Sequence, residues 1–194
     1  MANVLAIHSV GTSLATYLRN TYPGELRAAH PCEFKLFASA EMGSTEERGT
    51  TLSLYLYRIT MNEHVRNVRR TNDVVDNDTP LSVDLHFLLT VWADNALAEQ
   101  TILAWAMRQL HQRPVLDRST LSPEAGWESS DVVHVIPAEL SHEDLMRIWD
   151  ALAPSYRLSL SYIARVVRID ADPVPGGLPV VARNFVVSEP EAAR

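Results

Sequence analysis

The sequence has 194 residues, of which 46% are hydrophobic and 21% charged, and its formal net charge is −7. This composition suits one domain with one core and excludes global disorder, and the negative charge disfavours a general nucleic-acid binder. No apolar run reaches the roughly 18–20 residues of a membrane span. The N-terminus lacks a secretory-signal pattern, so we expect synthesis and folding in the cytoplasm. The single cysteine, Cys32, excludes an internal disulfide.

The first third of the chain predicts one helix followed by two strands. Residues 4–20 carry apolar side chains at spacings of three and four, which predicts a helix that ends at Pro23–Gly24. Residues 32–40 partly alternate and predict a strand, followed by a polar turn or loop. Residues 51–60 predict a stronger strand with apolar or aromatic groups on both faces, so we expect it inside a sheet. One face carries Leu52, Leu54 and Leu56, and the other carries Ser53, Tyr55 and Tyr57.

Four more elements follow the polar segment 61–79. Residues 81–92 are the clearest strand, and Asp94 or Asn95 then caps a helix that runs to about residue 113. Residues 132–137 predict a short strand. Ser141 and Asp144 predict a variant capping box at the start of the next helix. Residues 156–169 predict a long strand, with one face formed by Leu158, Leu160, Tyr162, Ala164 and Val166.

This order of elements predicts an α/β (α+β) fold, in which helices flank a single mixed β-sheet. We expect the domain to cover residues 1–170. Residues 171–194 contain Pro173, Pro175, Pro179 and Pro190, which exclude a helix and predict an extended C-terminal arm.

The residues contain no catalytic or metal-binding signature. His142, Glu143 and Asp144 begin like a zinc-protease motif, but residue 146 is Met rather than His. We therefore expect no metal or other cofactor. Asp84 and His86 share one face of a predicted strand. Their pairing is open to two interpretations: a catalytic dyad, or the favoured one, a polar pair that is buried or lies at an interface.

Residues 61–79 are too long for a structureless loop in a compact domain. They form either an extended hairpin or arm, or a segment that orders against a partner. Their arginines, Arg66, Arg69 and Arg70, could lie on a solvated loop, dock on an acidic partner, or contact nucleic acid. The nearby Asp73, Asp76 and Asp78 disfavour nucleic acid because carboxylates repel phosphate.

The C-terminal arm is the second candidate contact segment. It carries apolar side chains that are poorly suited to free solution, so strand addition to a neighbouring subunit competes with simple disorder. The candidate contacts with neighbouring subunits or partner proteins are Arg66, Arg69, Arg70, Asp73, Asp76, Val180, Val181, Arg183 and Phe185.

Five ordered segments carry a resemblance to a known family. They are SLYLYRI, PLSVDLHFLLTVWA, QLHQRPVLDRSTL, VIPAELSHEDLMRIWDAL and YRLSLSYIARVVRID. They resemble the cap (tail-terminator) proteins of contractile injection systems, which are phage-tail-like particles with an inner tube and a contractile sheath. The resemblance extends from the N-terminal helix to about residue 185.

The resemblance implies a fold like that of phage tail terminators and assembly as a hexameric ring. Such a ring binds the inner tube and sheath at the end distal to the baseplate and stops their polymerisation. It implies no enzyme activity, cofactor, membrane or nucleic acid, and it places the chain in a particle that is released outside the cell. Two alternatives stay open: a head-to-tail adaptor of a DNA-filled phage tail, and a small enzyme that uses Asp84 and His86.

Overall fold

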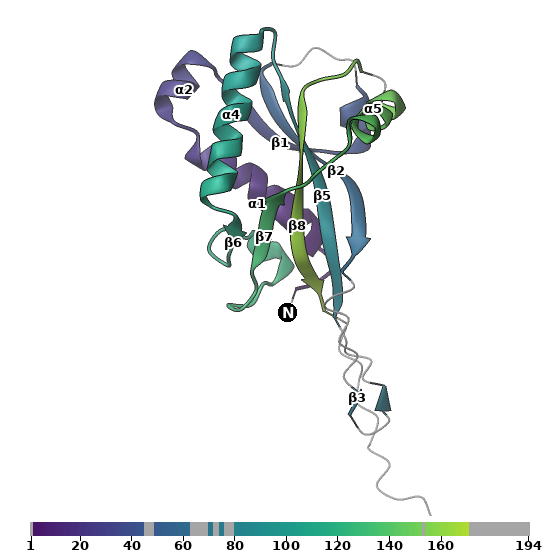
Figure 1. Cartoon of the computed structure of the whole chain (residues 1–194). Coiled ribbons are helices and arrows are strands. Elements are labelled where there is room, and N and C mark those ends of the chain that lie inside the picture. The colour runs from purple at the N-terminus through teal and green to yellow at the C-terminus, as the bar shows by residue number, and fades with distance from the viewer. Residues whose placement is uncertain are drawn as a thin grey trace, which may run out of the picture.

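A six-stranded mixed sheet forms the body of the molecule, and helices cover both of its faces (Figure 1). This computed structural model describes residues 2–44, 49–62, 80–152 and 154–170, together with the backbone of 70–71 and 74–75. The strand order is β1-β2-β5-β8-β7-β6. β1 runs parallel to β2, and the other neighbours are antiparallel. The predicted mixed sheet with flanking helices is confirmed.

The body strands are β1 (Glu33–Phe37), β2 (Thr51–Met61), β5 (Leu81–Trp92), β6 (Val115–Leu116), β7 (Val133–Pro137) and β8 (Ser159–Ile169). A separate two-stranded sheet consists of β3 (Arg70–Thr71) and β4 (Val74–Val75). The helices are α1 (Ala6–Thr21), α2 (Gly24–Ala29), α3 (Ser39–Gly43), α4 (Ala96–Gln112) and α5 (His142–Ala151), with a 3₁₀ turn, η2 (Pro123–Ala125).

The predicted helix caps are present. Asn95, rather than Asp94, caps α4, because its side-chain oxygen accepts a hydrogen bond from the N–H of Ala98 at 2.9 Å. The Ser141 hydroxyl accepts from the N–H of Asp144 at 3.0 Å and donates to the Asp144 carboxylate at 2.7 Å. The hydrogen bond from Ser141 to the Asp144 carboxylate makes this a variant of the capping box. In the usual capping box the acidic side chain accepts a hydrogen bond from the backbone N–H of the capping residue.

The short helices α2 and α3 were not predicted. The predicted strand 32–40 is too long, because β1 ends at Phe37 and α3 follows. The Glu41 carboxylate accepts a hydrogen bond from the N–H of Ala38 at 2.8 Å, which stabilises the first turn of α3. The helical turn also places Met42 in the protein interior, where it is fully buried.

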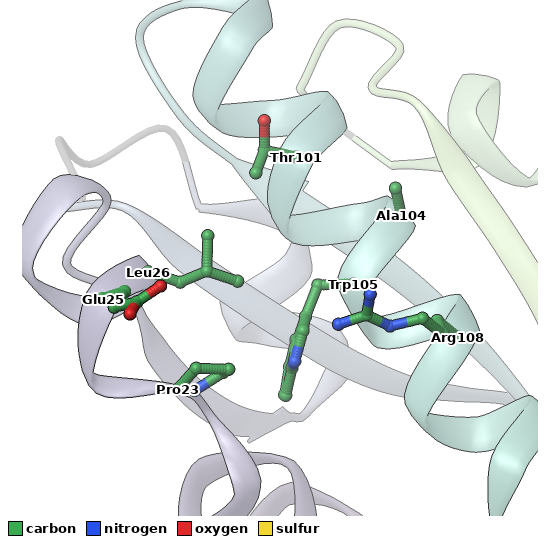
Figure 2. A pocket seen from close by; sticks show the side chains of 7 residues that line it. All are labelled: Pro23, Glu25, Leu26, Thr101, Ala104, Trp105 and Arg108. Carbon is green, nitrogen blue, oxygen red and sulfur yellow. The ribbon is translucent and has the colours of Figure 1, made fainter.

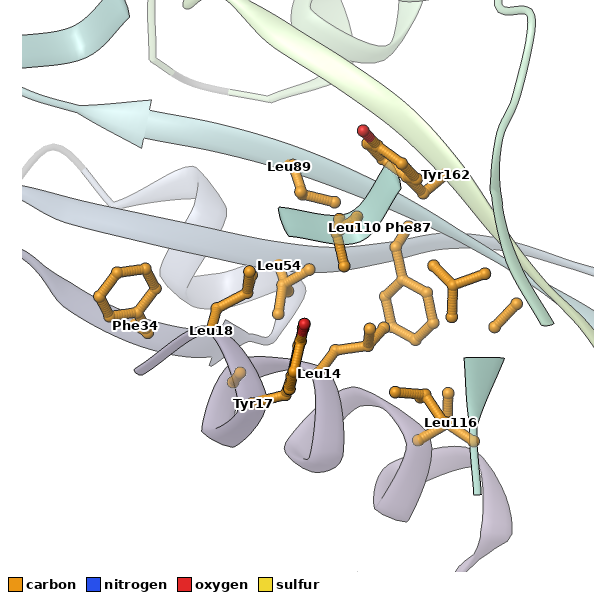
Figure 3. Packing of buried hydrophobic residues seen from close by; sticks show 14 of the residues in the cluster. Leu14, Tyr17, Leu18, Phe34, Leu54, Phe87, Leu89, Leu110, Leu116 and Tyr162 are labelled. Carbon is orange, nitrogen blue, oxygen red and sulfur yellow. The ribbon is translucent and has the colours of Figure 1, made fainter. Parts of the chain in front are cut away.

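The main core lies between the sheet and helices α1 and α4. Leu14 and Leu18 of α1 project towards Leu54 and Phe87 of the sheet, and all four side chains are buried (Figure 3). Complete burial of one such side chain contributes about 1.5–3 kcal/mol. This packing fixes α1 diagonally across one face of the sheet.

A smaller core covers part of the opposite face. Trp149 of α5 packs edge-on against Trp92 of β5, with ring centroids 6.0 Å apart, and Met42 of α3 lies in the same cluster. The apolar side chains of α5 form its contact surface: Trp149 is buried, and Leu145, Ile148 and Leu152 are half-buried. Both faces of the sheet therefore bury apolar side chains against helices.

A β-bulge in β8 makes one part of the predicted alternation of buried and exposed side chains wrong. The register pairs Leu85 with Ala164 and Val83 with Val167, so one residue of β5 faces two residues of β8. Val166, one of these two residues, has a positive backbone φ of 61°. Val167, rather than the predicted Val166, is therefore buried in the main core. Periodicity alone does not reveal where a bulge changes the alternation.

The predicted strand 156–169 also begins too early. β8 starts at Ser159, and Leu158, which was expected on the core face, is exposed. The Arg157 guanidinium donates to the carbonyl of Ala93 at 3.2 Å and lies 5.8 Å from the ring centre of Trp92. These contacts attach the segment to the end of β5 instead of extending the β8 ladder.

Trp127, in the loop between β6 and β7, is buried. Its indole N–H donates to the hydroxyl of Ser9 at 2.9 Å, and that hydroxyl donates to the carbonyl of Ser122 at 2.9 Å. The hydroxyl of Ser13, one turn along α1, accepts from the N–H of Ser122 at 2.7 Å. Two serines of α1 thus hold the loop between β6 and β7.

We expect Ser9→Ala to lower the free energy of unfolding by about 1–3 kcal/mol, because it leaves the buried indole N–H of Trp127 without an acceptor. Thr16→Ala, a half-buried change on the same helix, is the matched control. Urea unfolding followed by tryptophan fluorescence measures both variants. Equal stability of Ser9→Ala and the control would contradict this account.

Candidate interaction site

The predicted contact residues lie outside the described part of the chain, except that the backbone of Arg70 belongs to β3. The residues outside it are Arg66, Arg69, Asp73, Asp76, Val180, Val181, Arg183 and Phe185. β3 and β4 are antiparallel, with Arg70 opposite Val75 and Thr71 opposite Val74. This pairing confirms a hairpin within 61–79, whereas the contacts of its side chains stay predictions.

The hairpin segment begins and ends at two long central strands. β2 leads into it and β5 leads out of it, and Met61 pairs with Val83 at the last register position. The N–H of Asn62 donates to the carbonyl of Ser82 at 2.9 Å, which continues the ladder beyond β2. The base of this arm is therefore an extension of the central sheet.

A buried carboxylate, that of Asp84, connects three strands at the base of the arm. Its Oδ1 accepts from the side-chain amide of Asn62 at 2.9 Å and from the N–H of Val166 at 2.9 Å. Its Oδ2 lies 3.7 Å from Nε of Arg165. The carboxylate thereby satisfies the backbone N–H that the β8 bulge leaves without a ladder partner.

His86 does not form a catalytic dyad with Asp84. Its Nε2 lies 3.0 Å from the hydroxyl of Thr60, and its ring packs edge-on against Tyr57. Burial lowers the pKa of His86, and the Arg58 cation lowers it further, while Asp84 partly opposes the shift. Among the described residues, no hydrogen bond joins the His86 ring to the Asp84 carboxylate. The favoured interpretation was a buried hydrogen-bonded pair or an exposed interface pair. The buried hydrogen-bonded pair is wrong, because each side chain makes its own contacts within the sheet.

A groove of about 580 Å³ separates α2 from α4 (Figure 2). It is lined by Pro23, Glu25, Leu26, Thr101, Ala104, Trp105 and Arg108. The Trp105 ring forms much of its apolar wall, and Glu25 and Arg108 approach from opposite sides. The lining includes one carboxylate and one guanidinium but no histidine, serine or cysteine. Its volume lies within the roughly 300–1,000 Å³ of small-molecule sites.

Within the described ranges, no group of three or more His, Cys, Asp or Glu side chains is placed to hold a metal ion. Within the same ranges, no helix is both long and apolar enough to cross a bilayer.

The family of the chain follows from its sequence as a whole. A family model described as the Pvc16 N-terminal domain matches residues 9–183. The chain belongs to the Pvc16 N-terminal domain family. This membership, together with the two structural matches that follow, confirms the resemblance to cap (tail-terminator) proteins that the ordered segments indicated. No match is found among the curated proteins.

Two solved structures share the fold of this Pvc16 N-terminal domain. One is the sheath/tube terminator, in its extended state, of PVC, an extracellular contractile injection system. It is 17% identical, with a TM-score of 0.58, and the match covers 96% of this chain and 65% of that chain. The other is the tube-terminating cap of the anti-feeding prophage. It is 16% identical, with a TM-score of 0.55, and the match covers 93% and 59% of the two chains. The chain thus spans less than two thirds of either protein.

The chain also has an open strand edge that the sequence did not reveal. β1 pairs with β2 only along Thr51–Tyr55, and no described strand pairs with the outer edge of β2 from Leu56 to Met61. The expectation that β2 lies inside the sheet therefore holds only for its first half. The missed signal is the change after residue 57, where exposed Arg58, Ile59 and Met61 replace buried leucines.

We expect Asp84→Ala to lower the free energy of unfolding by about 2–3 kcal/mol, because it leaves the N–H of Val166 and the amide of Asn62 without their acceptor. Asp84→Asn retains the accepting Oδ1 and should cost less. Glu143→Ala, which removes an exposed ion pair with Arg147, should change stability by no more than about 1 kcal/mol. Chemical unfolding of the three variants checks the order, and an Asp84→Ala protein as stable as Glu143→Ala would refute it.

Proposed function

We propose that this chain is a structural cap of a contractile, phage-tail-like injection system. Six copies form a ring on the end of the inner tube and sheath distal to the baseplate, and this ring ends polymerisation of both. The particle is assembled in the cytoplasm and can be released from the cell. The proposal includes no catalytic activity, cofactor, membrane or nucleic acid.

The observation that carries this proposal is the match to terminator folds over nearly the whole chain. The family model spans residues 9–183, and the PVC terminator and the anti-feeding prophage cap share the fold over 96% and 93% of the chain. The described body, not an accessory segment, therefore carries the similarity.

The architecture is suited to ending a polymer. A terminating subunit has to bind the open end of a growing assembly and then present no equivalent end to the next subunit. We propose that the hairpin segment, which continues from the central strands, and a C-terminal arm act as attachment segments that differ from the sheet body. We propose that the body comprises residues 1–170 and the C-terminal arm residues 171–194.

A non-enzymatic role is supported by the contacts of Asp84 and His86, the two residues considered as a catalytic dyad. The Asp84 carboxylate holds the arm base and the β8 bulge, and His86 contacts Thr60 and Tyr57. Both side chains are thus committed to contacts within the sheet, where a substrate would have to displace them.

Deletion of the gene should produce overlong or ragged tubes and sheaths, because nothing then stops their growth. Electron microscopy of particles from matched strains gives the length distribution, and a plasmid copy of the gene restores it. Particles of uniform, normal length without the gene would overturn the cap proposal. Particles with a DNA-filled head would instead identify a head-to-tail adaptor.

The arm arginines are proposed to bind acidic groups of a neighbouring subunit or of the sheath. Replacing Arg66, Arg69 and Arg70 together by Glu should weaken attachment to purified particles several-fold at physiological salt, with unchanged thermal unfolding. Replacement of the same three residues by Lys retains the charge and serves as the control. Normal attachment of the Glu variant would rule out this role for the arginines.

A further inference from the structure

We propose that the exposed apolar side chain of Met61 on the β2 edge of one copy, with Ile59 beside it, docks in a notch beside β7 and β8 of the next copy. This inference rests on the proposed ring, and it identifies the two surfaces that meet at each subunit boundary. The occupant of the notch is therefore a second copy of this chain.

The projecting surface is the outer half of β2. Ile59 is 47% exposed and Met61 is 67% exposed, although both belong to the sheet face that carries the main core. In Figure 1 this part of β2 forms the margin of the sheet. Two neighbouring exposed apolar side chains on an open strand edge favour contact with another protein.

The receiving surface lies on the opposite margin of the sheet. β7 pairs with β8 only as far as Arg165, and beyond that point a notch of about 190 Å³ opens. The notch is lined by Trp127, Ser130, Asp131, Val132, Val133, Val166 and Arg168. Its volume is below the roughly 300–1,000 Å³ of small-molecule sites. One apolar side chain from a partner protein suits it better.

The two surfaces lie at the same level of the sheet. Met61 pairs with Val83, and Val83 pairs with Val167, which lies between the notch residues Val166 and Arg168. A head-to-tail contact closes into a ring only if successive copies do not rise along the axis. Surfaces at one level on opposite margins satisfy this requirement when the strands run roughly along the ring axis.

The charges near the two surfaces allow one contact between opposite signs. Exposed Arg58 lies beside Ile59 on the β2 edge. The segment from β6 to β7 has more described carboxylates than arginines, and one of them, that of Asp131, lines the notch together with Arg168 of β8. These carboxylates belong to Asp117, Glu124, Glu128 and Asp131. Opposite charges at the rim of an apolar contact favour association in one orientation and oppose contact between like margins.

Cysteine pairs test this contact in assembled particles. Cys32 is first replaced by Ala; burial already raises the pKa of its thiol to about 12, so the replacement removes a poorly reactive group. The test variant combines Met61→Cys with Val132→Cys, whose native valine is 43% exposed at the notch. The control combines Leu97→Cys with Val132→Cys, because Leu97 is 69% exposed on α4, away from the β2 edge. Particles are purified, oxidised and run on non-reducing gels.

The expected result is a ladder of linked subunits, up to six, for the test pair and a single band for the control pair. A single band from the test pair in particles of normal length that contain the chain would overturn the inference and leave the cap proposal standing. Absence of the chain from the particles, together with normal particle length in the deletion strain, would overturn both.

A second variant measures the contact without cross-linking. Met61→Glu replaces the docking apolar side chain by a charged one, so we expect overlong particles as in the deletion strain, with unchanged thermal unfolding because the side chain is exposed. Leu97→Glu is the matched control and should give normal lengths. Normal lengths with Met61→Glu would contradict docking of this side chain.

Discussion

The end of the sheet from which the hairpin segment leaves depends on the hydrogen bonds that the Asp84 carboxylate accepts. β5 has to pair with β2 on one side and with a bulged β8 on the other, and the bulge leaves the N–H of Val166 without a ladder partner. Asp84 accepts that hydrogen bond and also holds Asn62 at the exit to the hairpin. A buried charge is tolerated here because two donors and a nearby guanidinium offset the cost of removing it from water.

The two ends of the sheet have different roles as a consequence. At one end, α1, α3, α4 and α5 enclose the strands on both faces, and the aromatic clusters around Trp92 and Trp105 fix the packing. At the other end β2 and β8, on either side of β5, continue beyond β1 and β7, and no described strand pairs with their outer edges there. Stability is concentrated where helices cover the sheet, and the surfaces available to partners lie where they do not.

Much of this fold follows from local sequence patterns. The alternation of 81–92 predicted β5 with the observed bounds, and the Ser141 cap predicted the start of α5, because both signals involve neighbouring residues. The bulge at Val166, the short helix α3 and the open edge of β2 depend on pairing between distant segments, which periodicity does not encode. The candidate contact site was predicted as two segments, 61–79 and 171–190. The proposed contact surfaces at Met61 and Val132 depend on the order of the strands in the sheet, which local sequence patterns do not give.

The continuity between the hairpin and the central strands determines how the body would resist a pull. A force on the arm is directed along β2 and β5, whereas the hydrogen bonds to β1 and β8 run across the strands. Such a load shears the ladders, so many bonds resist it together. If the arm left from the face of the sheet, the bonds would open one after another. If the proposed arm binds a neighbouring assembly, this root suits it to remain attached under load.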